Sequence, residues 1–155
     1  MSLDTTLPIE KPINKILAPI DFSEASETAL RQALHLAHRA GAELTILHVS
    51  DATPCPPGYG AQQYLADVQA HITQTKAKIT ALAARLWPAT FAGTLKTEIV
   101  EGIPADEICK AAENADLIVI ATHGLSGFKR FVLGSTVDKV IRNAPCSVLV
   151  IKEKV

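Results

Sequence analysis

The chain lacks the features that mark several classes of protein. Only 5% of its 155 residues are aromatic, so aliphatic side chains must form most of any core. Its three cysteines, Cys55, Cys109 and Cys146, are far apart and include no CxxC pair, which argues against a disulfide scaffold or a zinc site. No apolar run approaches the roughly 20 residues of a membrane span, and residues 1–15 contain no signal-length apolar segment. We therefore expect a cytoplasmic protein in a reducing compartment.

An excess of charge of one sign is also missing. Fifteen Lys and Arg residues balance sixteen Asp and Glu residues, which leaves a formal net charge of −1. Electrostatic binding to nucleic acid or to a membrane surface needs a strongly basic face, so we expect neither partner. The length is that of a single domain. We expect a flexible N-terminal tail over residues 1–14 and one domain over residues 15–155.

Short apolar runs alternate with helical patterns along the chain. The predicted strands are residues 16–20, 44–49, 95–100, 117–121 and 147–151, and the predicted helices are residues 24–40, 62–86, 104–112 and 135–142. This order predicts an α/β fold with a doubly wound parallel sheet and helices on both faces. Polar and apolar residues alternate over residues 95–100, which is typical of an edge strand with one solvated face.

The long predicted helix carries an apolar stripe at helical spacing. We expect this stripe to face the core along its whole length. Its members are Leu65, Val68, Ile72, Ile79, Leu82 and Leu86.

The stretch after the fourth predicted strand has the composition of a phosphate site. Gly124 is followed by nine residues, including Lys129 and Arg130, and then by Gly134 and Ser135 at the start of a helix. Glycine lets the backbone approach a ligand, and the free N–H groups of a helix N-terminus favour an anion. A purely structural interpretation is also open: turn glycines, a helix cap and solvated cations. The sequence has neither GxxxxGK[ST] nor a GxGxxG after a strand, which excludes the commoner nucleotide motifs.

Three stretches of the chain resemble the universal stress proteins of the UspA family: KILAPIDFS, ILHVSD and DLIVIATHGLSGFKRFVLGSTVDKVIRNAPCSVLVIK. The resemblance extends from about Lys15 to Lys152. It implies a five-stranded parallel sheet in the order 3-2-1-4-5, the adenine-nucleotide-alpha-hydrolase-like fold. Nucleotide-binding members of the family carry the motif G-x2-G-x9-G-[ST] after the fourth strand.

This motif is matched at three of its four positions. Ala121 stands at the first glycine, while Gly124, Gly134 and Ser135 match the rest with the nine-residue spacing intact. Alanine adds only a methyl group, and a residue at a strand end does not need a positive φ, so we expect it to be tolerated.

The resemblance also implies which residues contact the ligand, an adenine nucleotide with or without magnesium. Pro19, Asp21 and Val49 would lie near the adenine and ribose, and Asp21 is a candidate ligand for a nucleotide-bound Mg²⁺ ion. The residues expected near the phosphates are His123, Gly124, Lys129, Arg130, Gly134, Ser135 and Thr136.

The last predicted strand is expected to form a dimer contact. Val148 to Ile151 is continuously apolar, although the implied order puts this strand at an edge, where bare apolar residues promote aggregation. Family members cover it with the same strand of a second subunit, so the resemblance implies a homodimer. The expected function is a stress-response regulatory protein that binds ATP, ADP or AMP. The alternatives are a dimeric interaction module without nucleotide and a slow ATP hydrolase.

Overall fold

The computed structural model describes residues 12–51, 54–87, 91–123 and 133–152. All the predicted strands and helices are present, with bounds that differ by at most a few residues. In chain order they are β1 (Lys15–Ile20), α1 (Glu24–Ala40), β2 (Glu43–Ser50), α2 (Ala61–Leu86), β3 (Leu95–Glu101), α3 (Pro104–Ala111), the 3₁₀ turn η1 (Ala112–Asn114), β4 (Leu117–Ala121), α4 (Ser135–Asn143) and β5 (Ser147–Ile151).

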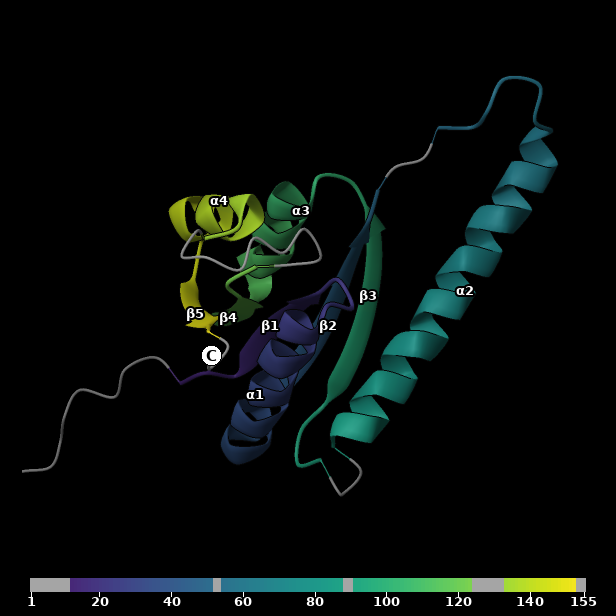
Figure 1. Ribbon diagram of the computed structural model, residues 1–155. Coiled ribbons are helices and arrows are strands. Elements are labelled where there is room, and N and C mark those ends of the chain that lie inside the picture. Colours follow the sequence, from purple (N-terminus) through teal and green to yellow (C-terminus); the bar gives the residue numbers. More distant parts are fainter. Residues whose placement is uncertain (1–11, 52–53, 88–90, 124–132, 153–155) are drawn as a thin grey trace, which may run out of the picture.

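The five strands form one parallel sheet in the order β3-β2-β1-β4-β5, as Figure 1 shows. This confirms the predicted fold class and strand order, and it puts β3 at an edge, as its alternating pattern indicated. Of the predicted tail over residues 1–14, residues 1–11 lie outside the described residues. At its end, the N–H groups of Asn14 and Lys15 both donate to Asp116 Oδ2 at 3.0 Å, which fixes the entry into β1.

Side chains alternate between the two faces of the sheet and build two separate cores. In β4, Leu117 and Val119 pack in the core beneath α1 and α2, whereas Ile118 and Ile120 pack in the core beneath α3 and α4. Helices therefore cover both faces, as expected for a doubly wound sheet buried on both sides. No helix in the described ranges is long and apolar enough to span a membrane.

Helix α1 begins and ends at the residues that its sequence indicates. The Oγ atom of Ser23 accepts the Ser26 N–H at 3.1 Å as an N-cap, and Gly41 ends the helix with φ +62°, the left-handed conformation that glycine adopts most easily. Between these caps, Ala29, Ala33 and Ala37 are almost fully buried, so the helix lies close to the sheet.

The prediction for the apolar stripe of α2 is wrong in its N-terminal half. Ile79, Leu82 and Leu86 are buried as expected, but 65% of Leu65 is exposed. The reason is length. At about 1.5 Å per residue, the 26-residue helix is about 39 Å long, whereas the 7-residue strand β3 beneath it spans about 23 Å. The N-terminal half of α2 therefore projects beyond the sheet (Figure 1).

Candidate functional site

A cavity of about 410 Å³ lies at the carboxyl ends of β1, β2 and β4. Its volume falls within the range of roughly 300–1,000 Å³ that is usual for small-molecule sites. Eight of the eleven predicted site residues line it: Pro19, Asp21, Val49, Ala121, His123, Gly134, Ser135 and Thr136. The other three, Gly124, Lys129 and Arg130, lie outside the described residues.

The cavity opens where β1 and β4 part. The two strands pair only at Ile16 with Leu117 and at Leu17 with Ile118, although β1 pairs with β2 along its whole length. After β1 the chain enters α1 on one face of the sheet, and after β4 it enters α4 on the other, so a crevice remains between the two strand ends. Pro19 lies at this point and has no N–H to donate to a neighbouring strand.

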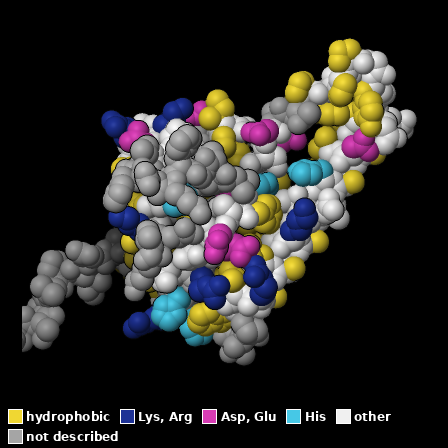
Figure 2. All heavy atoms as spheres, in the orientation of Figure 1, with side chains coloured by type: hydrophobic (Ala, Val, Ile, Leu, Met, Phe, Trp, Pro, Cys, Tyr) yellow, Lys and Arg dark blue, Asp and Glu magenta, His cyan; other side chains and the backbone are white. Residues whose placement is uncertain are grey.

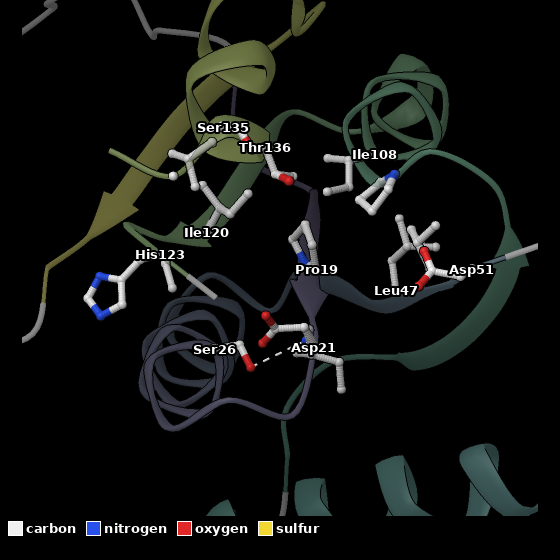
Figure 3. A pocket seen from close by; sticks show the side chains of 16 residues that line it. Pro19, Asp21, Ser26, Leu47, Asp51, Ile108, Ile120, His123, Ser135 and Thr136 are labelled. Atoms are coloured by element: carbon white, nitrogen blue, oxygen red, sulfur yellow. Dashed lines mark hydrogen bonds between the residues drawn. The ribbon is translucent and has the colours of Figure 1, made fainter. Parts of the chain in front are cut away.

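The turn between β1 and α1 fixes the carboxylate of Asp21 at the cavity. Asp21 Oδ1 accepts hydrogen bonds from the Ser23 N–H at 3.0 Å and from the Ser23 hydroxyl. Ser26 Oγ donates to the Ser23 carbonyl at 2.9 Å and accepts the Asp21 N–H at 3.4 Å (Figure 3). The two donors of Ser23 thus hold the carboxylate in one orientation, half-buried beside the mouth of the crevice, and Ser26 holds the backbone of the same turn.

The same turn contains a strained residue. Phe22 has φ +62°, which is rare for a residue with a bulky side chain. Its ring packs against His48, with ring centroids 4.9 Å apart, and His48 Nδ1 donates to the Ile20 carbonyl at 2.9 Å. These contacts with the neighbouring strand β2 support the left-handed turn that directs Asp21 to the cavity.

The opposite wall of the cavity is the N-terminus of α4. Gly134 precedes the helix without a side-chain cap, and the first intrahelical bond runs from the Asp138 N–H to the Gly134 carbonyl at 3.0 Å. The N–H groups of Ser135, Thr136 and Val137 therefore have no acceptor within the helix, and all three residues line the cavity. This wall suits an anion, because the free N–H groups and the helix dipole both carry partial positive charge.

A third part of the wall is apolar. Leu47 and Val49 come from β2, and Pro104 and Ile108 come from α3. In Figure 3 the side chains of Leu47 and Ile108 lie on the side of the cavity away from His123, and Asp51 lies at the edge of this slot. The cavity thus joins an apolar slot at one end to a group of N–H donors at the other.

Comparison with known proteins decides the family. The model of the universal stress protein family matches residues 12–152. The chain belongs to the universal stress protein family. It is 35% identical over 148 residues to universal stress protein MJ0531 of Methanocaldococcus jannaschii, covering 93% of this chain and 85% of the relative.

Solved structures of universal stress proteins share the fold. The UspA structure from Lactobacillus plantarum superposes with a TM-score of 0.72 at 33% identity, over 92% of this chain and 99% of that one. A universal stress protein solved in complex with cAMP gives a TM-score of 0.66 at 23% identity, over 93% of this chain and all of that one, and at this identity the likeness is one of fold.

The structure accommodates Ala121 at the first glycine of the family motif. The residue is buried in a small cluster with Ala25 and Ala29 of α1, with Ile151 packed against it. The methyl group is therefore part of the contact between β4 and α1. Alanine therefore fits between β4 and α1 at this position.

Sequence reasoning missed several residues that line this cavity. Ser26 lies one helical turn after the N-cap and looks like an ordinary helix residue, and Pro104 and Ile108 belong to a helix that follows a different strand. The only available signal was the position of α3, since it begins just after the carboxyl end of β3, on the same edge of the sheet as the predicted site.

Proposed function

We propose that this universal stress protein binds an adenine nucleotide, ATP, ADP or AMP, in the cavity between β1 and β4. The observation that carries the proposal is the two-ended form of the cavity, with an apolar slot at β2 and α3 and the uncapped N-terminus of α4 opposite. A nucleotide has the same division, with a flat base at one end and phosphate anions at the other. The cAMP complex of a protein with this fold supports the same interpretation.

The roles of the residues follow from their positions. Pro19 and Val49 would contact the adenine, and the carboxylate of Asp21 would accept hydrogen bonds from ribose hydroxyls. Ala121 supplies backbone at the strand end. The phosphate end is assigned to the start of α4 and the segment before it: His123, Gly124, Lys129, Arg130, Gly134, Ser135 and Thr136.

A magnesium ion would enter with the nucleotide. Among the described residues, no three His, Cys, Asp or Glu side chains gather as metal ligands. Of the two carboxylates that line the cavity, Asp21 and Asp51, Asp21 is held at the end of β1 by Ser23 and is the proposed ligand, so phosphate oxygens and water would complete the coordination.

We further propose that the protein acts as a regulator that responds to its nucleotide state, in the cytosol. No disulfide bond joins Cys55, Cys109 and Cys146, as in proteins of a reducing compartment. The proposed assembly is a homodimer through Val148 to Ile151 of β5. This strand is a sheet edge, and Leu149 on it is 38% exposed, so pairing with a second β5 would bury apolar surface and satisfy open backbone groups.

The nucleotide proposal is tested with a charge placed at the phosphate end. Ser135→Asp adds a carboxylate in the first turn of α4, which suits the helix but repels phosphate. We expect ATP affinity, measured by calorimetry with magnesium, to fall at least tenfold, while the affinity for adenosine, which has no phosphate, is unchanged. The control is Thr80→Asp, an exposed hydroxyl residue on α2 away from the cavity.

Two results would overturn the proposal. One is freshly purified protein that contains no nucleotide and binds none at millimolar ATP with magnesium. The other is an equal loss of ATP and adenosine affinity in Ser135→Asp, which would mean that α4 does not face the phosphates. The dimer is tested separately: light scattering should give Leu149→Glu half the mass of the wild-type dimer, and an unchanged mass contradicts the β5 interface.

A further inference from the structure

The projecting half of α2 is the largest feature that nucleotide binding leaves unexplained. The N-terminal half of α2 extends past the sheet (Figure 1), none of residues 61–74 is buried, and hydrophobic side chains gather over this end of the molecule (Figure 2). Leu65 is 65% exposed, and Val68 and Ile72 on the same face are only half-buried. Exposed apolar side chains clustered in this way mark a surface that another molecule covers.

The spacing of these residues indicates what covers them. From Leu65 the stripe continues at alternating steps of three and four residues, through Val68 and Ile72, to Leu86. Its C-terminal half, with Thr75, Ile79 and Leu82, already packs against the protein's own sheet. An alternation of three and four is the a and d pattern of a helix that packs against another helix along a narrow seam. The exposed half keeps this repeat where no sheet lies beneath it.

The charges of this segment distinguish it from a solvated helix. Residues 61–75 carry a single formal charge, Asp67, whereas Lys76, Lys78 and Arg85 follow within the next ten positions. Asp67 itself accepts hydrogen bonds from the Tyr59 hydroxyl and from Gln63 Nε2, the latter at 2.8 Å. Interface cores are depleted of charge in the same way.

The lack of Lys and Arg in residues 61–75 also indicates which kind of molecule covers this surface. A face without lysine or arginine lacks the cations by which amphipathic helices bind membrane surfaces. The seam residues Leu65, Val68 and Ile72 are uncharged and do not repel an identical seam, and symmetric contacts between identical patches are the commonest way in which proteins assemble. The occupant that fits is a second copy of α2.

We propose that the 61–74 segment of α2, hereafter the α2 tip, pairs with the α2 tip of a second molecule. The two helices run antiparallel, because each globular body lies at the C-terminal end of its own α2 and this arrangement keeps the bodies apart (Figure 1). Leu65 and Val68 of one tip pack against Val68 and Leu65 of the other. This contact lies at the β3 side of the molecule, and the proposed homodimer uses β5 at the other edge of the sheet, so the two contacts can form together.

Two heptads of one helix bury less than the roughly 800 Å² per partner of a standard stable interface, so the contact is weak on its own. Its formation therefore depends on protein concentration. When β5 pairs as well, each dimer presents two α2 tips, and assembly beyond the dimer becomes favourable through multivalency.

The test compares two glutamate variants of the same helix by sedimentation velocity over a range of concentrations. Leu65→Glu places a charge in the seam, and Ala70→Glu places the same charge about 140° around the helix, on the outer side. We expect the mass of the wild type and of Ala70→Glu to rise with concentration, and the mass of Leu65→Glu to stay constant over the same range. Since Leu65 is largely exposed, the fold should survive, as circular dichroism will show, and Leu65→Gln replaces the variant if it does not.

The outcomes separate this contact from the β5 dimer. The mass of Leu149→Glu should still rise with concentration, and the mass of the double variant Leu149→Glu/Leu65→Glu should not. This result would support the α2 contact even if the β5 dimer does not form. If the wild type, Leu65→Glu and Ala70→Glu have equal mass at every concentration, the proposal is overturned. The proposal is also overturned if the α2 tip binds lipid vesicles or a different protein while the mass of the purified chain stays constant.

Discussion

The backbone N–H of Gly134 donates a hydrogen bond to the carbonyl oxygen of Thr122, with an N–O distance of 2.9 Å. Thr122 follows β4 and Gly134 precedes α4, so this bond sets the distance between the strand end and the helix start. Gly134 has φ −59°, which any residue adopts, and a Cβ atom there would lie at an ordinary 3.4 Å from the same oxygen. The position therefore depends on its N–H more than on the absence of a side chain.

Replacement of Gly134 by proline should accordingly be worse than replacement by alanine. Proline fits this φ but removes the N–H, so we expect Gly134→Pro to lower the free energy of unfolding by about 1–2 kcal/mol and to weaken nucleotide binding. Alanine keeps the N–H, and its effect should stay within about 1 kcal/mol. Urea unfolding and calorimetric titration measure both quantities. Equal losses in the two variants would show that the bond to Thr122 is unimportant.

The N-cap of α1 should contribute measurably to stability. Ser23 accepts the Ser26 N–H and donates to Asp21, so Ser23→Ala leaves a buried N–H and a carboxylate each short of a partner. We expect a loss of about 1 kcal/mol in urea unfolding. Thr28→Ala serves as the control, since the Thr28 hydroxyl bonds only to the Glu24 carbonyl within an exposed turn. If Ser23→Ala and Thr28→Ala lower the free energy of unfolding by the same small amount, Ser23 is not the N-cap that stabilises α1.

The methyl group of Ala121 should matter for stability and not for the ligand. Ala121→Gly removes a buried methyl from the contact with α1 and loosens a strand, so we expect a loss of about 1–2 kcal/mol. Ala18→Gly, buried in β1 on the same face of the sheet, should cost a similar amount. Nucleotide affinity should be unchanged in Ala121→Gly. A several-fold rise in affinity would instead mean that the methyl obstructs the nucleotide.

A link between Tyr59 and Asp67 should open in acid. The hydrogen bond from Tyr59, and after it that from Gln63, lowers the pKa of Asp67 below its ordinary value, and the same bond raises the pKa of Tyr59. A carboxyl whose folded pKa is lowered stabilises the link above its unfolded pKa, and this contribution is lost as the pH falls through the folded pKa. NMR titration of the Asp67 carboxyl should therefore give a midpoint below the ordinary Asp range.

Tyr59→Phe checks the cause of this shift. Because the Tyr59 hydroxyl is the larger cause, its loss should move the Asp67 midpoint most of the way to the ordinary value, and Gln63→Ala should move it less. The reverse order would show that the link from the loop to α2 is not the dominant interaction. Both side chains are exposed, so the global stability should hardly change.

Local patterns determined the elements and the fold class of this protein. Ser23 and Gly41 delimit α1 because capping and left-handed conformations depend on a few neighbouring atoms. The alternating residues of β3 indicated an edge, since a strand with one wet face shows it in its own sequence. The site residues were located by the resemblance to a family and by the rule that ligands bind at strand ends, and eight of them lie around one cavity.

Only the tertiary structure decided how far each surface is buried. Leu65 and Ile79 belong to the same regular stripe, yet one is exposed and the other has no exposure at all, because the helix is longer than the sheet beneath it. Ser26 and Ile108 reach the cavity from helices on opposite faces of the sheet, a meeting that depends on how β1 and β4 part. Periodicity is a property of one segment, whereas burial depends on which other segments lie against it, and that is set by the packing of the whole chain.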